Sequence, residues 1–336
     1  MRFEIVTTLP ICRDKAMGQV KIRGLAEGVL IFLLLLTVGC GQNATFALKF
    51  APEDITTYKL TTKAEQSVIW EGPLANKPKG FIGGHTGSKI ELTFKQRILS
   101  VDDKGNAVAE ITIDGLKYMA KVRDNVTLDF DSSRVKDRND PLSKLIGQSY
   151  TIEMTTSGDV SRVLDVNYAR AAAGNVPKAV RLFSDRVIKG RHHVPALPDE
   201  DRTQLRAGDS WSNIKTFSFG RMGSKTYERT YKVKEIKNIG GHQTAVVGMS
   251  VVPSSQRAKE LHKEQGSDFF SKMFDNPVEI YTGRLKLDLT AGKVEQYLEE
   301  FKSEWVAVDP AATDKDKEPD MLRMGAIRIY SIERID

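Results

Sequence analysis

Beyond its N-terminal segment the chain alternates apolar and polar residues with a period of two, and this alternation limits the possible folds more than any other feature. In Lys89–Ile98 the apolar residues Ile90, Leu92, Phe94 and Ile98 share one phase, and lysine, glutamate, threonine and arginine fill the opposite phase. The run ends at the turn Asp102–Asn106, whose Gly and Asn tolerate the positive φ of hairpins. A second alternating run begins at Ala107. Such runs predict antiparallel strands with one buried and one solvated face.

Three blocks of the sequence occur twice, in the same order. They pair Gly87–Ile111 with Gly223–Met249, Glu53–Thr62 with Gly208–Phe217, and Ile152–Val163 with Leu285–Tyr297. Chance similarity between amphipathic strands could produce any one block, but three in order favour a duplicated β unit. If the halves are repeats, we expect Trp211 to hold in the second unit the place that Tyr58 holds in the first, each anchoring an opening strand.

Two segments depart from the alternation. Val166–Ile188 has apolar residues at helical spacing, and Pro177 is well placed to begin a second helix there. In Ser254–Phe274 the apolar residues predict a helix that packs on the sheet, or alternatively a lid over a hydrophobic cavity. The candidate lid or hydrophobic-ligand residues are Phe269, Phe270, Met273 and Phe274.

These patterns predict a mainly β fold with a few helices, that is, a β-rich α+β protein. Two similar antiparallel β units form a curved-sheet or half-barrel arrangement, with a helical segment between them. The expected divisions are a signal peptide over 1–39, β unit 1 over 40–165, a helical bridge and connector over 166–206, and β unit 2 over 207–336. The second unit carries the helical insertion near 254–275.

The stretch Leu33–Gln42, "LLLLTVGCGQ", has the features of a bacterial signal peptide. Its apolar run from Gly28 to Gly39 is about a dozen residues, whereas a membrane-spanning helix needs roughly 20. Cations precede the run and small residues follow it. Leu36 to Cys40 resembles a lipobox, with the leucine one place further back than usual, so we expect lipidation of Cys40. A start at Met17 would give a compact signal. The alternative is a core or amphipathic helix that ends in Gly-Cys.

Removal of residues 1–39 has consequences for disulfides and charge. Of the two cysteines, Cys12 is removed and Cys40 is acylated, so we expect no disulfide. The removed segment carries five cations and three anions, and the mature chain keeps +4 of the net charge of +6. Its densest basic stretch, Lys225–Lys237, alternates with acidic and apolar residues and is interpreted as the solvated face of a strand. We therefore expect no nucleic-acid partner.

No pattern in the sequence indicates catalysis, a cofactor or a metal site. Gly-x-Ser-x-Gly, P-loop and dinucleotide-binding motifs are absent from the sequence. His192 and His193 have no cysteine nearby and are interpreted as ordinary loop residues. The acidic run Asp314–Asp320 lacks the glycine and the closing glutamate of a calcium loop. The carboxylates are scattered among lysines, as on a solvated surface, although a pair that forms only in three dimensions stays possible. We expect a protein that is not an enzyme.

Several of these motifs together resemble a known family. They are the lipobox, the Thr230–Val233 hairpin "TYKV", and the approach to the second unit through Leu197-Pro198 and Gly208-Asp209-Ser210-Trp211. The chain resembles a family of uncharacterised envelope lipoproteins of planctomycete-type bacteria, catalogued as a domain of unknown function. The resemblance implies an envelope location, a duplicated β architecture and a non-enzymatic role.

Two functions fit these expectations. The first is a lipid-anchored, non-enzymatic binding or structural module that contacts another envelope protein. The alternative is a carrier of a lipid or other hydrophobic ligand in a cavity of the curved sheet. The membrane partner is reached through the lipid on Cys40. Because Gly41 follows the cysteine where aspartate could stand, we expect the outer membrane, facing the periplasm.

Changing Cys40 to Ser should abolish acylation, because the thiol that accepts the lipid is lost. The product should be uncleaved or soluble in membrane fractionation and should lack the acyl mass in mass spectrometry. A Cys40→Ser protein that is still membrane-bound and processed at the same point would contradict the lipoprotein interpretation.

Overall fold

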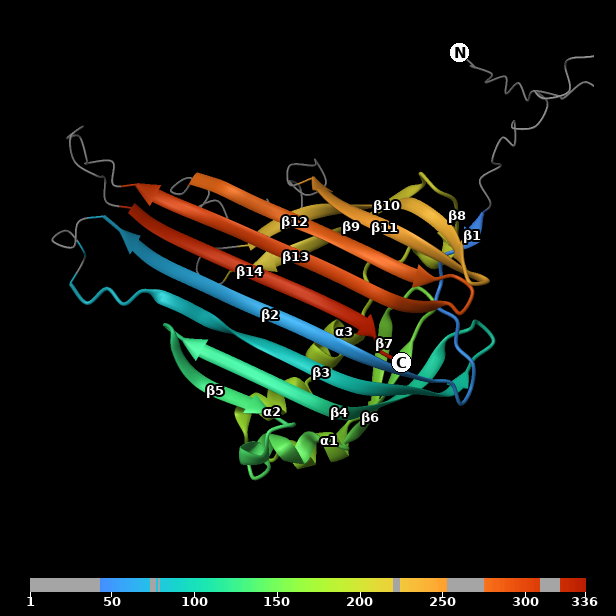
Figure 1. The fold of residues 1–336 in the computed structure, drawn as a ribbon, viewed down its shortest axis with the longest axis horizontal. Coiled ribbons are helices and arrows are strands. Elements are labelled where there is room, and N and C mark those ends of the chain that lie inside the picture. The colour runs from blue at the N-terminus through green and yellow to red at the C-terminus, as the bar shows by residue number, and fades with distance from the viewer. Residues whose placement is uncertain (1–42, 73–76, 78, 220–223, 253–274, 309–320) are drawn as a thin grey trace, which may run out of the picture. The chain divides into compact units, whose positions relative to one another are not determined.

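The computed structural model describes residues 43–72, 77, 79–219, 224–252, 275–308 and 321–336. Most of these residues belong to one antiparallel sheet of 12 strands (Figure 1). The first half of the chain contributes β2 (Ile55–Glu71), β3 (Gly84–Val101), β4 (Ala107–Val122), β5 (Asn125–Asp131), β6 (Ser149–Met154) and β7 (Val160–Asp165). The second half contributes β9 (Ser210–Ser218), β10 (Ser224–Ile239), β11 (His242–Val252), β12 (Asp275–Asp288), β13 (Lys293–Val308) and β14 (Met321–Arg334).

The strand order is β7-β6-β4-β3-β2-β14-β13-β12-β11-β10-β9, and β5 pairs beside it with β4. Each half is a meander, and the two halves join where β2 pairs with β14 over the registers from Met321–Glu71 to Arg334–Tyr58. Among the described residues the sheet stays open, with β7 and β9 at its two ends. The predicted β-rich fold with a curved sheet is confirmed.

Short helices lie in the sequence between the two halves. They are α1 (Asn167–Ala173), α2 (Pro177–Leu182) and α3 (Asp185–His192), with the 3-10 turns η2 (Val135–Asp137), η3 (Pro141–Leu145) and η4 (Glu200–Arg202) before and after them. Gly174, at φ 54°, follows α1, and α2 begins at Pro177, where the sequence predicts a second helix. Helices this short are unstable alone in water. They are held by packing, since Ala169, Phe183 and Ile188 are buried in the same core as the first-half strands.

The second half covers its inner face in a different way. Phe217 of β9 and Phe301 of β13 stack with ring centroids 4.8 Å apart, although three strands lie between β9 and β13 in the sheet. Neighbouring strands are spaced about 4.8 Å apart, so a flat sheet would separate these rings by roughly 19 Å. The sheet must therefore curl strongly here, and its inner face folds over itself.

The matched sequence blocks fall on strands that occupy equal places in the two meanders. Tyr58 of β2 lies opposite Phe94 of β3, and Trp211 of β9 lies opposite Tyr231 of β10. Both pairs have ring centroids 5.7 Å apart. All four side chains are buried. Trp211 is thus buried against an aromatic residue of the next strand, as Tyr58 is in the first half.

One sequence interpretation was wrong in this region. His192 is not a loop residue, because it ends α3 and is buried against Phe94, with ring centroids 4.9 Å apart. Its Nε2 lies 2.6 Å from the Tyr150 hydroxyl. Burial, and then the charge of Arg191, lower the pKa of His192 well below its ordinary value. A neutral histidine therefore serves as a core residue.

Trp211→Ala should lower the free energy of unfolding by about 3–5 kcal/mol, because it removes a core aromatic that is only 8% exposed. Urea unfolding followed by circular dichroism measures the change. Tyr168→Ala is the control, since Tyr168 is 78% exposed and its loss should change stability by less than about 0.5 kcal/mol. An unchanged midpoint for Trp211→Ala would show that this ring is not part of the core.

Candidate functional site

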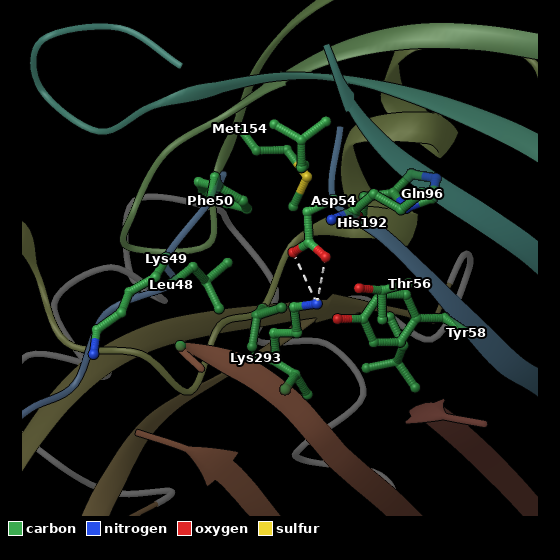
Figure 2. Close-up of a pocket in the computed structure, with 15 residues that line it drawn as sticks. Leu48, Lys49, Phe50, Asp54, Thr56, Tyr58, Gln96, Met154, His192 and Lys293 are labelled. Atoms are coloured by element: carbon green, nitrogen blue, oxygen red, sulfur yellow. Dashed lines mark hydrogen bonds and ion pairs between the residues drawn. The ribbon is translucent and has the colours of Figure 1, made fainter. Parts of the chain in front are cut away.

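A small cavity lies where the segment before β2 crosses the ends of both halves (Figure 2). The N–H groups of Phe46, Leu48 and Lys49 donate to the carbonyl oxygens of Thr203, Thr156 and Gly292 at 2.8–3.0 Å. This segment begins with β1 (Ala44–Thr45), which pairs with β8 (Gln204–Leu205). It therefore ties the connector and a turn of each half together.

The cavity itself is too small for a ligand. Its volume is about 30 Å³, which is room for roughly one water molecule. Figure 2 shows the Lys293 ammonium directed at the Asp54 carboxylate, and the two oxygens lie 2.8 and 2.9 Å from Nζ. The charges of Asp54 and Lys293 are paired, and the Lys49 ammonium donates to the carbonyl oxygens of Leu289 and Thr290, so this feature has a structural role.

A larger pocket opens on the inner face of the sheet, between the end of α3 and strands β9, β13 and β14. Its volume is about 200 Å³. We call it the basic pocket, and its lining includes Lys63, His193, Lys215, Phe217, Glu299, Phe301, Arg328 and Tyr330. Lys63 of β2 has a carboxylate partner, since its ammonium lies 3.8 Å from Glu65. Helix and sheet residues from distant parts of the sequence meet here, because the curl of the second half brings β9 over β13.

Glu299 is the only acidic residue that lines the basic pocket among the described residues, and its charge is fully engaged. The hydroxyl groups of Tyr281 and Tyr297 donate to its two oxygens, the second at 2.7 Å. Arg229 Nη1 donates to both oxygens at 3.2 and 3.3 Å. Burial, and then the charge of Glu299, raise the pKa of both tyrosines above 10, so their hydroxyls keep their protons and act as donors.

Arg229 corrects an expectation from the sequence. The stretch Lys225–Lys237 was interpreted as a solvated face, but Arg229 is in phase with Tyr231 and is only 4% exposed. Its Nε donates to Asn213 Oδ1 at 2.8 Å, and its guanidinium lies over the Tyr231 ring. Arg229 and Glu299 thus form a buried pair whose charges neutralise each other.

Two further cations line the basic pocket without any such partner. Lys215 and Arg328 make no ion pair or hydrogen bond through their side chains to any residue that the structure describes. Lys215 Nζ lies 5.8 Å from the centroid of the Phe217 ring. Burial lowers the pKa of Lys215, the charge of Glu299 opposes that shift, and Arg229 adds to it. Burial also lowers the pKa of Arg328.

The end of α3 forms the wall of the pocket opposite the sheet. The Tyr330 hydroxyl donates to the carbonyl oxygens of Arg191 and His193, at 2.8 and 3.2 Å. His193 Nδ1 lies 2.8 Å from an Asp159 oxygen. Burial lowers the pKa of His193, and Asp159 opposes the shift. These contacts fix the backbone of the wall to β14 and to the β6–β7 turn.

Aromatic rings continue from the pocket along the inner face of the second half. Phe217 contacts Tyr281 at 5.3 Å as well as Phe301, and Phe219 contacts Trp305 at 5.1 Å. The pocket therefore combines cations with an apolar aromatic surface, and Lys215 lies over one of the rings.

The residues predicted from the sequence as sites fall elsewhere. Cys40 and the candidate lid residues Phe269, Phe270, Met273 and Phe274 lie outside the described residues, as does the acidic run Asp314–Asp320. Within the described ranges, no group of three or more His, Cys, Asp or Glu side chains could hold a metal ion. No helix in those ranges has the length and apolarity needed to cross a membrane.

Sequence reasoning missed the basic pocket, although a signal was present. Lys215 is in phase with Trp211 and Phe217, Glu299 with Tyr297 and Phe301, and Arg328 with Tyr330 and Ile332. A charged residue in phase with the buried face of a strand is expensive to bury and so marks a position with a special role. The scattered-surface interpretation of the charges overlooked this phase.

Arg229→Met should destabilise the protein by about 3–5 kcal/mol, because it leaves Glu299 buried without its countercharge. The double variant Arg229→Met, Glu299→Gln should recover part of that loss, since the isolated charge is gone. Arg284→Met on the outer face of β12 is the control, and should change stability by less than about 0.5 kcal/mol. Urea unfolding measures all three. A double variant no more stable than Arg229→Met would show that the charge of Glu299 is not what Arg229 compensates.

Comparison with known proteins identifies neither a family nor a function for this chain. No protein-family model matches the chain, and no curated protein matches it. A solved structure described as "Lipid-protein interactions in lipovitellin" is similar with a TM-score of 0.39 and 11% sequence identity. The similarity covers 86% of this chain and 26% of that one, so the chain spans about a quarter of the length of the lipovitellin chain. At this TM-score the likeness assigns neither a family nor a function, and the site must be interpreted from its own residues.

Proposed function

We propose that this protein is a lipid-anchored, non-enzymatic envelope protein that binds a small hydrophobic ligand in the basic pocket. The observation that carries the proposal is the pocket on the inner face of the sheet, lined by the rings of Phe217 and Phe301. Ligand pockets are typically concave, apolar and aromatic, with a few polar groups at fixed places. The basic pocket has the aromatic rings of such a site, and its polar groups are more numerous, with His193, Lys215, Glu299 and Arg328 beside them.

The size of the pocket limits the ligand. At about 200 Å³ it is smaller than the usual range of roughly 300–1,000 Å³ for ligand sites. It therefore suits a small molecule, or one end of a longer one whose remainder extends along the aromatic surface. Of the two functions expected from the sequence, the pocket and its two rings support the carrier of a lipid or other hydrophobic ligand over a purely structural module.

The proposed anchor complements this role. Only Gly41, Gln42 and Asn43 separate Cys40 from β1, so a lipid on Cys40 would hold the folded part on a short tether. We place the protein in the outer membrane, facing the periplasm, where a tethered binding protein would meet lipids and other envelope proteins.

The test is to purify the full-length Cys40→Ser protein without detergent and to identify co-purified molecules by mass spectrometry after organic extraction. We expect a hydrophobic ligand in stoichiometric amount, and a higher melting temperature when the ligand is added back to stripped protein, because binding to the native state stabilises it. Phe217→Ser should lose the ligand, whereas Tyr168→Ser, an exposed position on α1, should keep it. Absence of any ligand, together with no thermal shift from added fatty acids, would favour the structural module.

A further inference from the structure

The charges that line the basic pocket do not balance. Glu299 is compensated by Arg229, and its oxygens are occupied by the two tyrosine hydroxyls and the guanidinium. Lys215 and Arg328 are then left as positive charge on a half-buried surface, with no carboxylate among the described residues within ion-pair distance. Two like charges that face one cavity repel each other, and desolvation adds to the cost of each.

The outer face of the same half is built differently. There Lys286 pairs with Glu295 at 2.5 Å, and Lys302 pairs with Glu304 at 3.1 Å. Two lysines on the outer face, for which pairing contributes little, thus have carboxylate partners, whereas two cations on the inner face, for which pairing matters more, have none among the described residues. A charge arrangement of this kind suits a site whose missing negative charge arrives with a ligand.

We propose that the ligand of the basic pocket is an amphiphilic anion, with one carboxylate or phosphate head bound by Lys215 and Arg328. This inference rests on the proposed function and names the class of ligand. The guanidinium can bind either head with two parallel hydrogen bonds, and the ammonium adds a charge-assisted contact. The apolar chain lies against Phe217 and Phe301, next to the head group.

The pocket also explains why a free inorganic anion is the weaker candidate. Phe217 and Phe301 provide an apolar surface that an inorganic ion cannot use, and burial of each methylene contributes roughly 0.8 kcal/mol. An anion attached to a chain uses both parts of the pocket. A neutral amphiphile uses only one and leaves both cations without a counterion.

The experiment uses the full-length Cys40→Ser protein, stripped of ligand, and isothermal titration calorimetry below the critical micelle concentration. The probes are decanoate, decyl phosphate, decan-1-ol and inorganic phosphate. We expect the two amphiphilic anions to bind at least about tenfold more tightly than decanol, the smallest effect of a charge-assisted hydrogen bond. Inorganic phosphate should bind more weakly than decyl phosphate by a similar or larger factor. The ratio of decanoate to decyl phosphate affinity distinguishes a fatty-acid ligand from a phospholipid-type ligand.

Two variants test the cations directly. Lys215→Met and Arg328→Met should each weaken decanoate binding by about ten- to a hundredfold and leave decanol binding within about twofold. The matched controls are Lys232→Met on β10 and Arg284→Met on β12, which remove the same charges from exposed positions on the outer face. Both controls should bind decanoate like the parent protein, since exposed charges beyond a Debye length of about 10 Å are screened.

A second readout does not depend on ligand. Without ligand, Lys215→Met and Arg328→Met should melt at the same temperature as the parent protein or higher, because each removes an uncompensated cation. Decanoate should raise the melting temperature of the parent protein more than that of either variant. A clear fall in the ligand-free melting temperature of both variants would show that the cations already have partners, and would overturn the inference.

The remaining outcomes separate the two proposals. If decanol binds as tightly as decanoate and the variants bind both alike, the anionic class is wrong, and a hydrophobic-ligand function stands. If inorganic phosphate binds as tightly as decyl phosphate, the amphiphilic part is wrong. If no probe binds the parent protein and no molecule co-purifies with it, the proposed function fails and the inference fails with it.

Discussion

The fold depends on the pairing of β2 with β14, the first and last long strands of the chain. This antiparallel ladder joins two meanders into one sheet, so that the inner faces of both halves belong to a single core. No disulfide is expected to support it. Because the pairing brings opposite ends of the chain together, it has a large loop-closure cost, which the apolar burial on both sides of the ladder must offset. Everything that lies on the inner face, including the basic pocket, is positioned relative to this ladder.

The two halves cover their inner faces by different means. The basic pocket lies between the helices that cover the first half and the curled strands of the second half. The first half is covered by α1, α2 and α3, and the second half by its own curl, which stacks Phe217 on Phe301. The end of α3 forms one wall of the pocket. The Tyr330 hydroxyl fixes that end to β14 and so determines the height of the pocket wall. The pocket is therefore a product of the fold's asymmetry and not of either repeated unit alone.

Much of the fold can be predicted from the sequence, because strand alternation and turn glycines are local signals. The repeat also leads to the expectation that Trp211 is a buried anchor of an opening strand, as it is. The curl of the second half cannot be predicted in this way, since it results from packing between strands that are far apart in the sheet. The basic pocket depends on that curl, and so Glu299 and Arg229 meet only in three dimensions. The phase of Lys215 within its strand can be recognised in the sequence. That no carboxylate in the described part of the chain lies within ion-pair distance of Lys215 cannot be predicted in this way. His192 illustrates the same limit, because its burial depends on a neighbour, Phe94, that is distant in sequence.

The direction of the two meanders has a consequence for how the sheet ends. Both run the same way along the sheet, so the β14–β2 joint is head-to-tail, and a joint of this type can in principle be repeated without limit. The lengths of the strands explain why further units do not add to the sheet. The strands at the joint have 17 and 14 residues, whereas the outermost strands β7 and β9 have 6 and 9. Short outer strands are a known means of preventing edge-to-edge association. The long strands β2 and β14 therefore pair inside the sheet, and short strands form its two edges. This arrangement favours a sheet that ends after two units over one that grows into a fibre.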